Sequence, residues 1–396
     1  MWSYQLRALT LVVAFSLLLV PGNRVSAQSP PQVLVSDSGV QTVTIGPGAP
    51  AHTIGLQGHR QVITLDTGAQ TFGLRYVVAR DPQDPQAAIP GEGYIGMPQP
   101  VDCNWYGGGF FDVQLNGQSI GTTLIHSLTG RSSAGRGTAD FVFDTSQAVV
   151  RVRFVAQAGG DCLFAQVLLE PKVEIQSVRL ALRCYPSAFV SDAQRHVLTA
   201  TRDLAQGERA ELDIGSEWWT LYYDRIYDAG YTSPTHRGVG PCGLLWLPEQ
   251  TAKTGFTVGS YGIETILTLN PTGRDFRFVF FDYAGRKNDA AQADLRGRAQ
   301  RQREELATFA FTEPGIAKWP LPQKQAEMRQ ALASLPEDRE TAAQYDQWAR
   351  DLESQLKLIR AGSAGAIMGE AQAAKTISQW EQGVPALRLK ALLNEI

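Results

Sequence analysis

Short runs of alternating apolar and polar residues follow one another from Gln32 to Gly285, and no amphipathic helix interrupts them. In Val150–Phe154 the apolar side chains fall on one face of a strand and two arginines fall on the other. The same period of two recurs in Phe111–Asn116, Val178–Cys184 and Phe276–Phe280. Many short strands without intervening helices are typical of an antiparallel sandwich or barrel rather than a parallel α/β sheet. We therefore predict a mainly β fold, a large antiparallel β-sandwich, over residues 28–285.

Two turn signals lie within this region. Asn116-Gly117 predicts a two-residue hairpin, because both residues tolerate the positive φ angles that such a turn needs. Glu170-Pro171-Lys172 marks either a seam between two sandwich lobes or a turn within one assembly. The length of the β-rich region favours one large assembly over a single small sandwich.

After Gly285 the sequence changes to strong helix formers. Lys287–Phe309 is rich in Ala, Gln, Arg and Glu and predicts a helix, whereas residues 312–322 contain three prolines and predict a linker. Pro336 suits the first turn of a second helix, which Gly362 ends. A third helix over residues 371–382 is expected to end at Gly383, and Pro385 to begin a short fourth. We predict an α-helical C-terminal region over residues 286–396.

The second of these helices has one apolar stripe. Its members recur at spacings of three and four and are Tyr345, Trp348, Leu352, Leu356 and Ile359. Packing onto the sandwich or the other tail helices is one interpretation, and binding of a protein partner is the other. The heptad pattern is too short for a coiled coil, which favours packing.

The N-terminus has the layout of a cleavable signal peptide. Arg7 precedes an apolar run from Leu9 to Val20, and Val25-Ser26-Ala27 supplies small residues for cleavage before Gln28. The alternative is a membrane anchor, but the run is shorter than the roughly 20 residues that cross a bilayer. We therefore predict a signal peptide over residues 1–27, a secreted or periplasmic protein, and no membrane span after cleavage.

Four cysteines lie after this cleavage site: Cys103, Cys162, Cys184 and Cys242. In an exported protein an even number permits two disulfides, in any of three pairings. Buried free thiols are the alternative, and the sequence does not choose between the two.

Charge and motifs exclude several functions. A formal net charge of −3 without a basic cluster in the β-rich part argues against nucleic-acid binding. The five histidines show no metal-ligand spacing, so we expect no metal and no cofactor. Gly238-Val-Gly240-Pro-Cys-Gly243 matches a dinucleotide fingerprint by letter, but Pro241 lies inside it and a strand follows where a helix is needed.

Aromatic and charged residues crowd together from Glu217 to His236. One face of an extended segment can enter the core while the other presents flat rings beside charged groups, as a sugar site requires. The ligand-binding candidates in this stretch are Trp218, Trp219, Tyr222, Tyr227 and Arg237. A second cluster, Asn104, Trp105 and Tyr106, precedes Gly107–Gly109, whose glycines would let the backbone approach a ligand. In both clusters the aromatics could instead be ordinary core residues.

Any chemistry here would be acid–base work on a sugar. A carboxylate paired with a histidine or a second carboxylate suits proton transfer at such a substrate. The titratable candidates are Glu217, Asp224, Asp228, His236 and Glu264.

Three segments resemble the galactose-mutarotase-like super-sandwich group of carbohydrate-active proteins. These segments are Leu169–Leu180, Arg183–Ser187 and Phe280–Gly285, together with the strands that precede them. The resemblance implies a super-sandwich fold and a sugar ligand, and an enzyme of this kind would be an epimerase or mutarotase, a hydrolase or a lyase. Mutarotases use a His and a Glu in a sugar cleft, and no motif here matches them.

Two hypotheses of function follow. The first is a secreted carbohydrate-binding or carbohydrate-processing protein with an aromatic and acidic cleft. The second is a non-catalytic envelope protein that mediates protein–protein contacts, with its helical tail binding a protein partner.

Overall fold

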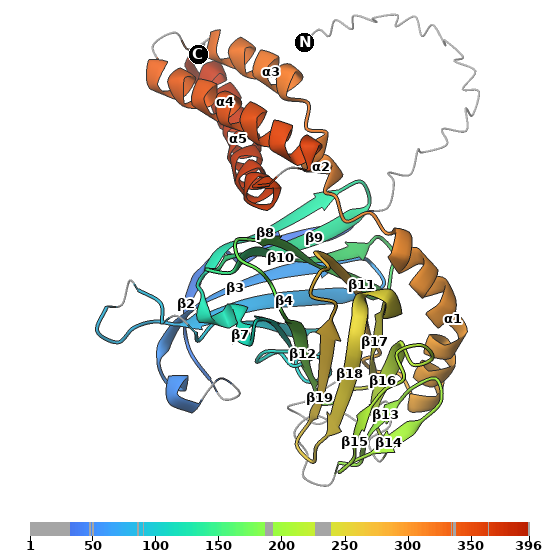
Figure 1. Ribbon diagram of the computed structural model, residues 1–396. Helices are drawn as coiled ribbons and strands as arrows, with labels where there is room; N and C mark the ends of the chain where they lie inside the picture. The colour runs from blue at the N-terminus through green and yellow to red at the C-terminus, as the bar shows by residue number, and fades with distance from the viewer. Residues whose placement is uncertain are drawn as a thin grey trace, which may run out of the picture. The chain divides into compact units, whose positions relative to one another are not determined.

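In the computed structural model, residues Pro31–Ile396 form one compact unit. The structure describes residues 32–46, 49, 51–84, 87–89, 91–186, 193–225, 239–333, 335, 338–362 and 364–394. Their strands form two antiparallel sheets, one of eleven strands and one of nine (Figure 1). The predicted mainly β fold with C-terminal helices is therefore confirmed.

The eleven-stranded sheet presents the face on which the candidate site lies. Its strands, in spatial order, are β1 (Leu34–Asp37), β3 (Gln57–Asp66), β4 (Thr71–Ala79), β5 (Tyr94–Gln99), β6 (Phe111–Leu115), β12 (Val178–Cys184), β19 (Ile263–Leu269), β18 (Thr251–Val258) and β15 (Arg209–Glu211). Two short strands lie off this path, with β2 (Gln41–Thr44) pairing with β3 and β7 (Gln118–Ser119) pairing with β6. Asn116 and Gly117 have φ angles of 48° and 81° between β6 and β7, which confirms the predicted hairpin.

The nine-stranded sheet packs against the inner face of the first sheet. Its order is β14 (Asp203–Ala205), β13 (Arg195–Leu198), β16 (Trp219–Asp224), β17 (Cys242–Trp246), β20 (Asp275–Asp282), β11 (Cys162–Pro171), β10 (Ala148–Gln157), β9 (Arg136–Asp144) and β8 (Ile125–Ser133). Pro171 ends β11 of this sheet, and the chain continues through Lys172 to β12 of the eleven-stranded sheet. Short 3-10 turns cover Ala51–Thr53, Ile120–Thr122 and Pro248–Gln250.

One hydrophobic core fills the space between the two sheets. The apolar positions of the predicted strands alternate into it, as in β12, where every second residue from Val178 to Cys184 is buried. Phe154 of one sheet packs edge-on against Phe111 of the other, with ring centroids 5.5 Å apart. Burial of each such ring stabilises the fold by about 1.5–3 kcal/mol.

The helices follow the last strand. They are α1 (Asn288–Thr308), α2 (Pro314–Ala317), α3 (Leu321–Ala333), α4 (Arg339–Ala361) and α5 (Ala366–Asn394). The predicted first and second helices correspond to α1 and α4, and Gly362 ends α4 in the left-handed conformation at φ 57°. No helix within the described ranges is long and apolar enough to cross a membrane.

Two expectations for the tail were wrong. Residues 312–322 are not a plain linker, because Pro314 starts α2 and Leu321 starts α3, and α3 itself was not predicted. The helix α5 continues through Gly383 and Pro385. A side chain at Gly383 would collide with the Tyr345 hydroxyl, with a Cβ only 1.9 Å from it, so this glycine serves close packing of α4 and α5 rather than a helix end.

The apolar stripe of α4 packs against the other tail helices. Tyr345 meets Trp380 of α5 edge-on at 5.1 Å, and Leu352 and Leu356 are buried in the same cluster. The structure thus supports the packing interpretation of this stripe.

The polar face of β10 is buried, contrary to what alternation alone suggests. Arg151 and Arg153 are 6% and 0% exposed because Glu370 of α5 covers them. Arg153 also binds Asp140 through two hydrogen bonds of 2.6 Å. This ion-pair cluster fixes α5 to the outer face of the nine-stranded sheet.

All four cysteines are buried free thiols in the structure. Burial raises the pKa of the Cys162 thiol to about 12, and the Cys242 thiol donates a hydrogen bond to the Asn104 carbonyl at 3.2 Å. The free-thiol alternative is therefore the one that the structure shows, and the disulfide alternative is not.

Candidate functional site

The two sheets differ in how their outer faces are covered. The helix α1 runs along the nine-stranded sheet (Figure 1). It buries Leu295 and Leu306 against residues such as Trp219 and Phe281. On the eleven-stranded sheet, the outward residues instead line two adjoining pockets. A ligand therefore has access to the eleven-stranded sheet.

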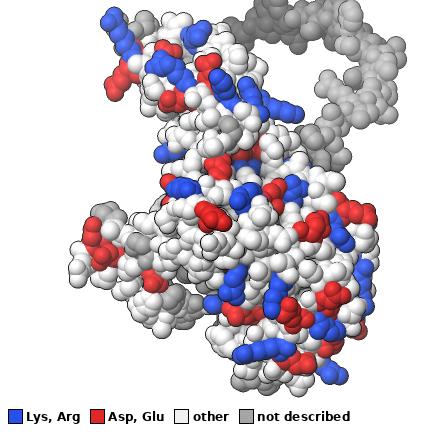
Figure 2. Space-filling model, viewed as in Figure 1, with Lys and Arg blue, Asp and Glu red and all other residues white. Residues whose placement is uncertain are grey.

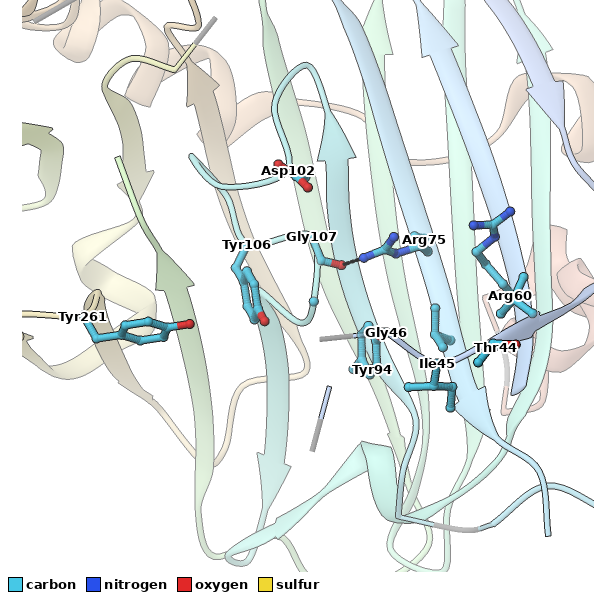
Figure 3. A pocket seen from close by; sticks show the side chains of 13 residues that line it. Thr44, Ile45, Gly46, Arg60, Arg75, Tyr94, Asp102, Tyr106, Gly107 and Tyr261 are labelled. Atoms are coloured by element: carbon cyan, nitrogen blue, oxygen red, sulfur yellow. Dashed lines mark hydrogen bonds between the residues drawn. The ribbon is translucent and has the colours of Figure 1, made fainter. Parts of the chain in front are cut away.

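The first hollow, the arginine pocket, has a volume of about 320 Å³. Its walls come from β2, β3, β4 and β5, from the loop between β5 and β6, and from the turn between β18 and β19 (Figure 3). The residues that define it here are Thr44, Ile45, Arg60, Arg75, Tyr94, Asp102, Tyr106, Gly107, Gly108 and Tyr261.

Strand register places both arginines on one face. Arg60 lies opposite Val77 and Arg75 opposite Val62, so the two arginines are diagonal neighbours on adjacent strands. Tyr94 of β5 lies opposite Val77 on the other side of β4, on the same face. Burial raises the pKa of the Tyr94 phenol, and the charges of Arg75 and Arg60 oppose that rise.

Glycines bring the Asp102–Gly109 loop down onto the sheet. A Cβ at Gly96 would lie 1.8 Å from the Gly107 carbonyl oxygen, so only glycine permits this approach. The Gly107 N–H donates to the Asp102 carbonyl at 2.7 Å, and Arg75 donates through Nη2 to the Gly107 carbonyl. The loop therefore forms one wall of the arginine pocket and orients Arg75.

The second hollow, the central pocket, has a volume of about 550 Å³ and adjoins the first at Tyr94 and Gly108. Its charged lining residues are Glu92, Asp112, Arg179, Arg183 and Glu264. We call the two pockets together the outer groove.

Carboxylates and guanidinium groups alternate across the central pocket. Asp112 accepts hydrogen bonds from the Ser119 hydroxyl at 2.5 Å and the Gln114 amide at 2.9 Å. Burial raises the pKa of this carboxyl group, against the effect of these hydrogen bonds. Arg183 and Glu264 are register partners on β12 and β19, with a nitrogen and an oxygen 3.7 Å apart. Both are about half exposed, so they can also bind a ligand.

Glu217, the first predicted acid, lies outside the outer groove in a buried ion pair. Its carboxylate accepts hydrogen bonds from the Thr199 hydroxyl at 2.5 Å and the Thr201 hydroxyl at 2.8 Å, and it pairs with Arg202. Although burial acts to raise it, these bonds lower the pKa of Glu217 to about 2. A carboxylate held in this way stabilises the β13–β16 region and is poorly placed to exchange protons with a ligand.

The other predicted acids and bases do not join Glu217. Asp224 is 1% exposed at the end of β16 and accepts a hydrogen bond from the Gln194 N–H at 3.3 Å. Glu264 lies in the central pocket. Asp228 and His236 lie outside the described residues, so the described candidates contribute only Glu264 to the outer groove.

The described aromatic candidates of the same stretch pack against the core or the helix α1. Tyr222 is fully buried between the sheets, with its hydroxyl 2.8 Å from that of Thr265. Trp219 is buried under α1, and Trp218 lies beneath the Arg303 guanidinium at 5.0 Å. Tyr227 and Arg237 lie outside the described residues. The described aromatic residues here are core and helix contacts, and the pockets of the outer groove do not include them.

The second predicted cluster divides between core and pocket. Asn104 is buried and donates a hydrogen bond to Asp282 at 2.8 Å, and the Trp105 indole donates to the Phe281 carbonyl at 3.0 Å. Tyr106 instead lines the arginine pocket, together with Gly107 and Gly108. Burial raises the pKa of the Tyr106 phenol to about 12, so it is neutral at physiological pH.

Sequence reasoning missed most of the outer groove. Arg60, Arg75, Tyr94 and Asp112 come from four strands and meet only through strand register. One signal was available: Arg75 is a lone charge within the apolar run Phe72–Ala79, which marks a polar function on that sheet face.

The fold and the outer groove define a class: a two-sheet antiparallel sandwich with helices covering one sheet and a polar groove on the other. No protein-family model matches the chain, and no curated protein matches its sequence. Solved structures similar to it include the α-galactosidase AgaB of Geobacillus stearothermophilus, with 11% identity and a TM-score of 0.34 over 57% of this chain and 40% of that one.

Two further similar structures are also carbohydrate-processing enzymes. The α-galactosidase of Lactobacillus brevis has 11% identity and a TM-score of 0.32, covering 60% of this chain and 40% of its own. The α-N-acetylgalactosaminidase NagBb of Bifidobacterium bifidum has 9% identity and a TM-score of 0.35, covering 70% and 42%. This chain thus spans about two-fifths of the length of these enzymes. At such scores the likeness assigns neither a family nor a site, and the function is argued from the outer groove itself.

Proposed function

We propose that this protein is exported and binds carbohydrate in the outer groove. The observation that carries the proposal is the combination of tyrosine rings with both donors and acceptors on an outer sheet face that no described helix covers. Ligand pockets commonly have volumes of about 300–1,000 Å³, and both pockets fall within this range.

The chemistry of the outer groove suits a polyhydroxylated ligand. A sugar hydroxyl both donates and accepts, so it is best bound where guanidinium donors and carboxylate acceptors lie side by side. Arg183 and Glu264 offer such a pair in the central pocket. Tyr94 borders both pockets, and its ring gives the C–H face of a sugar an apolar surface.

The proposal concerns binding rather than a reaction. Of the five predicted acids and bases, the described ones place only Glu264 in the outer groove, while Glu217 and Asp224 are buried elsewhere. The alternative, a non-catalytic envelope protein, would use the exposed leucines at the end of α5. These leucines are Leu389, Leu392 and Leu393, each exposed by 59–63%.

Export rests on the signal-peptide pattern of residues 1–27. Expression of the full chain in a bacterium, followed by N-terminal sequencing of the periplasmic or secreted protein, should give a first residue of Gln28. Retention of an intact N-terminus in the membrane fraction would overturn this part of the proposal.

A glycan array with the mature chain tests binding. We expect at least one oligosaccharide class to bind, Tyr94→Ala to reduce its affinity at least about 10-fold, and Tyr94→Phe to retain most of it. Trp218→Ala is the matched control, because Trp218 is an aromatic residue outside the outer groove. Absence of any glycan signal, or equal losses in Tyr94→Ala and Trp218→Ala, would refute the proposal.

A further inference from the structure

We infer that the arginine pocket binds the carboxylate of an acidic sugar, while the central pocket binds the uncharged, hydroxyl-bearing remainder of the ligand. This inference rests on the proposed carbohydrate function and specifies its substrate class. The evidence for it is the difference in charge between the two pockets and the uncharged hydrogen-bond partners of Arg60 and Arg75.

The arginine pocket carries positive charge without a counter-charge bound to it. Within the described residues, neither Arg60 nor Arg75 forms an ion pair, whereas Arg183 in the neighbouring pocket pairs with Glu264. Arg60 donates to the Gln41 side-chain oxygen at 2.9 Å, and Arg75 donates to the Gly107 carbonyl. Neutral acceptors therefore orient both guanidinium groups, and among the described residues no carboxylate lies within ion-pair distance of either.

Both guanidinium groups are also incompletely hydrogen-bonded. The Nε atoms of Arg60 and Arg75 are buried and have no partner among the described atoms. A guanidinium has five N–H donors in a planar fork, and here each side chain uses few of them. An anion binds most strongly to cations that are partly shielded from water, because a charge-assisted hydrogen bond is stronger where water is excluded.

The lining residues of the two pockets differ in net charge. The arginine pocket contains Arg60, Arg75 and a single acid, Asp102. Figure 3 shows Asp102 beside Gly107, on the same side of Arg75 as that glycine, and its side chain is exposed to solvent. The central pocket has three acids, Glu92, Asp112 and Glu264, against Arg179 and Arg183. A carboxylate is thus attracted to the first pocket and repelled by the second.

Ring positions fit this division of the ligand. Tyr94 lies where the two pockets adjoin, and Tyr106 borders the arginine pocket on the side away from Arg60 (Figure 3). A pyranose ring over Tyr94 would direct an equatorial carboxylate toward the arginines. Hydroxyls on its other side would then face Asp112 on the neighbouring strand, and further sugar units would extend toward Glu264, three strands from Tyr94.

Titration calorimetry with three probes of the same length tests the inference. The probes are an oligogalacturonate, its fully methyl-esterified form, and a galactan oligosaccharide that carries sulfate groups but no carboxylate. We expect the oligogalacturonate to bind at least 10-fold more tightly than the ester, with a preference that weakens as NaCl is raised. Arg60→Gln and Arg75→Gln should each reduce the preference several-fold and together abolish it. Arg75→Gln also removes a contact to the Gly107 loop, so the acid-to-ester affinity ratio within each variant is the quantity compared.

Arg274→Gln is the matched control, since Arg274 is an exposed arginine outside both pockets. Arg60→Gln keeps the Gly107 loop contact of Arg75 intact, so it reports on charge even where Arg75→Gln shifts the loop. Equal binding of acid and ester would overturn the inference and leave the proposed function standing. Tighter binding of the sulfated probe than of the oligogalacturonate would overturn the carboxylate assignment. Failure of every carbohydrate probe, including those of the array, would overturn the proposed function itself.

Discussion

Replacement of Asp282 by asparagine should remove a strong pH dependence of stability. Asp282 ends β20 and is 6% exposed. Its Oδ1 accepts hydrogen bonds from the Asn104 amide at 2.8 Å and the Ala284 N–H at 2.9 Å, whereas Oδ2 is buried and has no hydrogen-bond partner among the described residues. Burial raises the pKa of this carboxyl group from 3.8 to about 7, because the charged form loses its hydration.

The sign and size of the effect follow from this pKa. Because folding raises this pKa, the protonated carboxyl group makes its full contribution to the stability of the folded state below pH 3.8. That contribution is lost as the pH rises from 3.8 through about 7. The loss is about 1.4 kcal/mol for each pH unit, or about 4 kcal/mol in total. An asparagine oxygen can accept both existing hydrogen bonds without ever ionising. The stability of Asp282→Asn relative to the wild type should therefore rise by about 4 kcal/mol between pH 4 and pH 8.

Urea unfolding of the mature chain at pH 4, 5, 6, 7 and 8 measures this difference. Glu174→Gln is the control for loss of one acid, since Glu174 is exposed in the loop between β11 and β12. Its curve should run parallel to that of the wild type. Parallel curves for Asp282→Asn and wild type across the same pH range would show that Asp282 is ionised without cost, and the reasoning would fail.

Three further predictions concern the Gly107 loop, the attachment of α5 and the Glu217 ion pair. Gly96→Ala should displace the loop and reduce carbohydrate affinity at least about 10-fold, since the new Cβ would lie 1.8 Å from the Gly107 oxygen. Gly255→Ala is its control and should bind carbohydrate normally in the same titration, because the nearest atom to its Cβ would be 3.8 Å away. Glu370→Gln should destabilise the protein by about 3–5 kcal/mol, because it leaves Arg151 and Arg153 without part of their buried counter-charge, and limited proteolysis should then cut between the sandwich and α5. Exposed Glu353→Gln in α4 is its control, and equal protease resistance of the two variants would argue against the docking role. Glu217→Gln should lower the free energy of unfolding by about 1–2 kcal/mol at pH 7, a modest value because water screens Arg202, which is 38% exposed. The difference from the wild type should vanish as the pH falls from about 4.5 to about 2, where Glu217 becomes protonated. A difference that stays constant in thermal unfolding from pH 7 to pH 2.5 would contradict the lowered pKa of Glu217.

Local pattern alone predicted much of the fold. The period of two identified which residues of β12 and β20 enter the core, because successive side chains of a strand point to opposite faces. Asn116-Gly117 and Gly362 marked a hairpin and a helix end for equally local reasons, since each position requires a positive φ angle.

Tertiary structure decided whether each face is covered. The alternation in Val150–Phe154 is the same whether its arginines meet water or Glu370, a residue more than 200 positions away. Likewise the aromatic residues around Trp219 could have lined a cleft, but α1 packs over them. The sequence pattern shows on which face of a strand a side chain lies, but it does not show which segment packs against that face.

The outer groove depends on distant neighbours in the same way. Arg60, Arg75 and Tyr94 become one pocket through the pairing of three strands, and Gly96 allows a loop from further along the chain to close it. Each residue alone is an ordinary polar position on a strand. The sequence by itself determined that this chain builds a two-faced sandwich with a helical tail. Only the packing of α1 and α5 determined which outer face stays open, because coverage is a contact between segments that lie far apart in sequence.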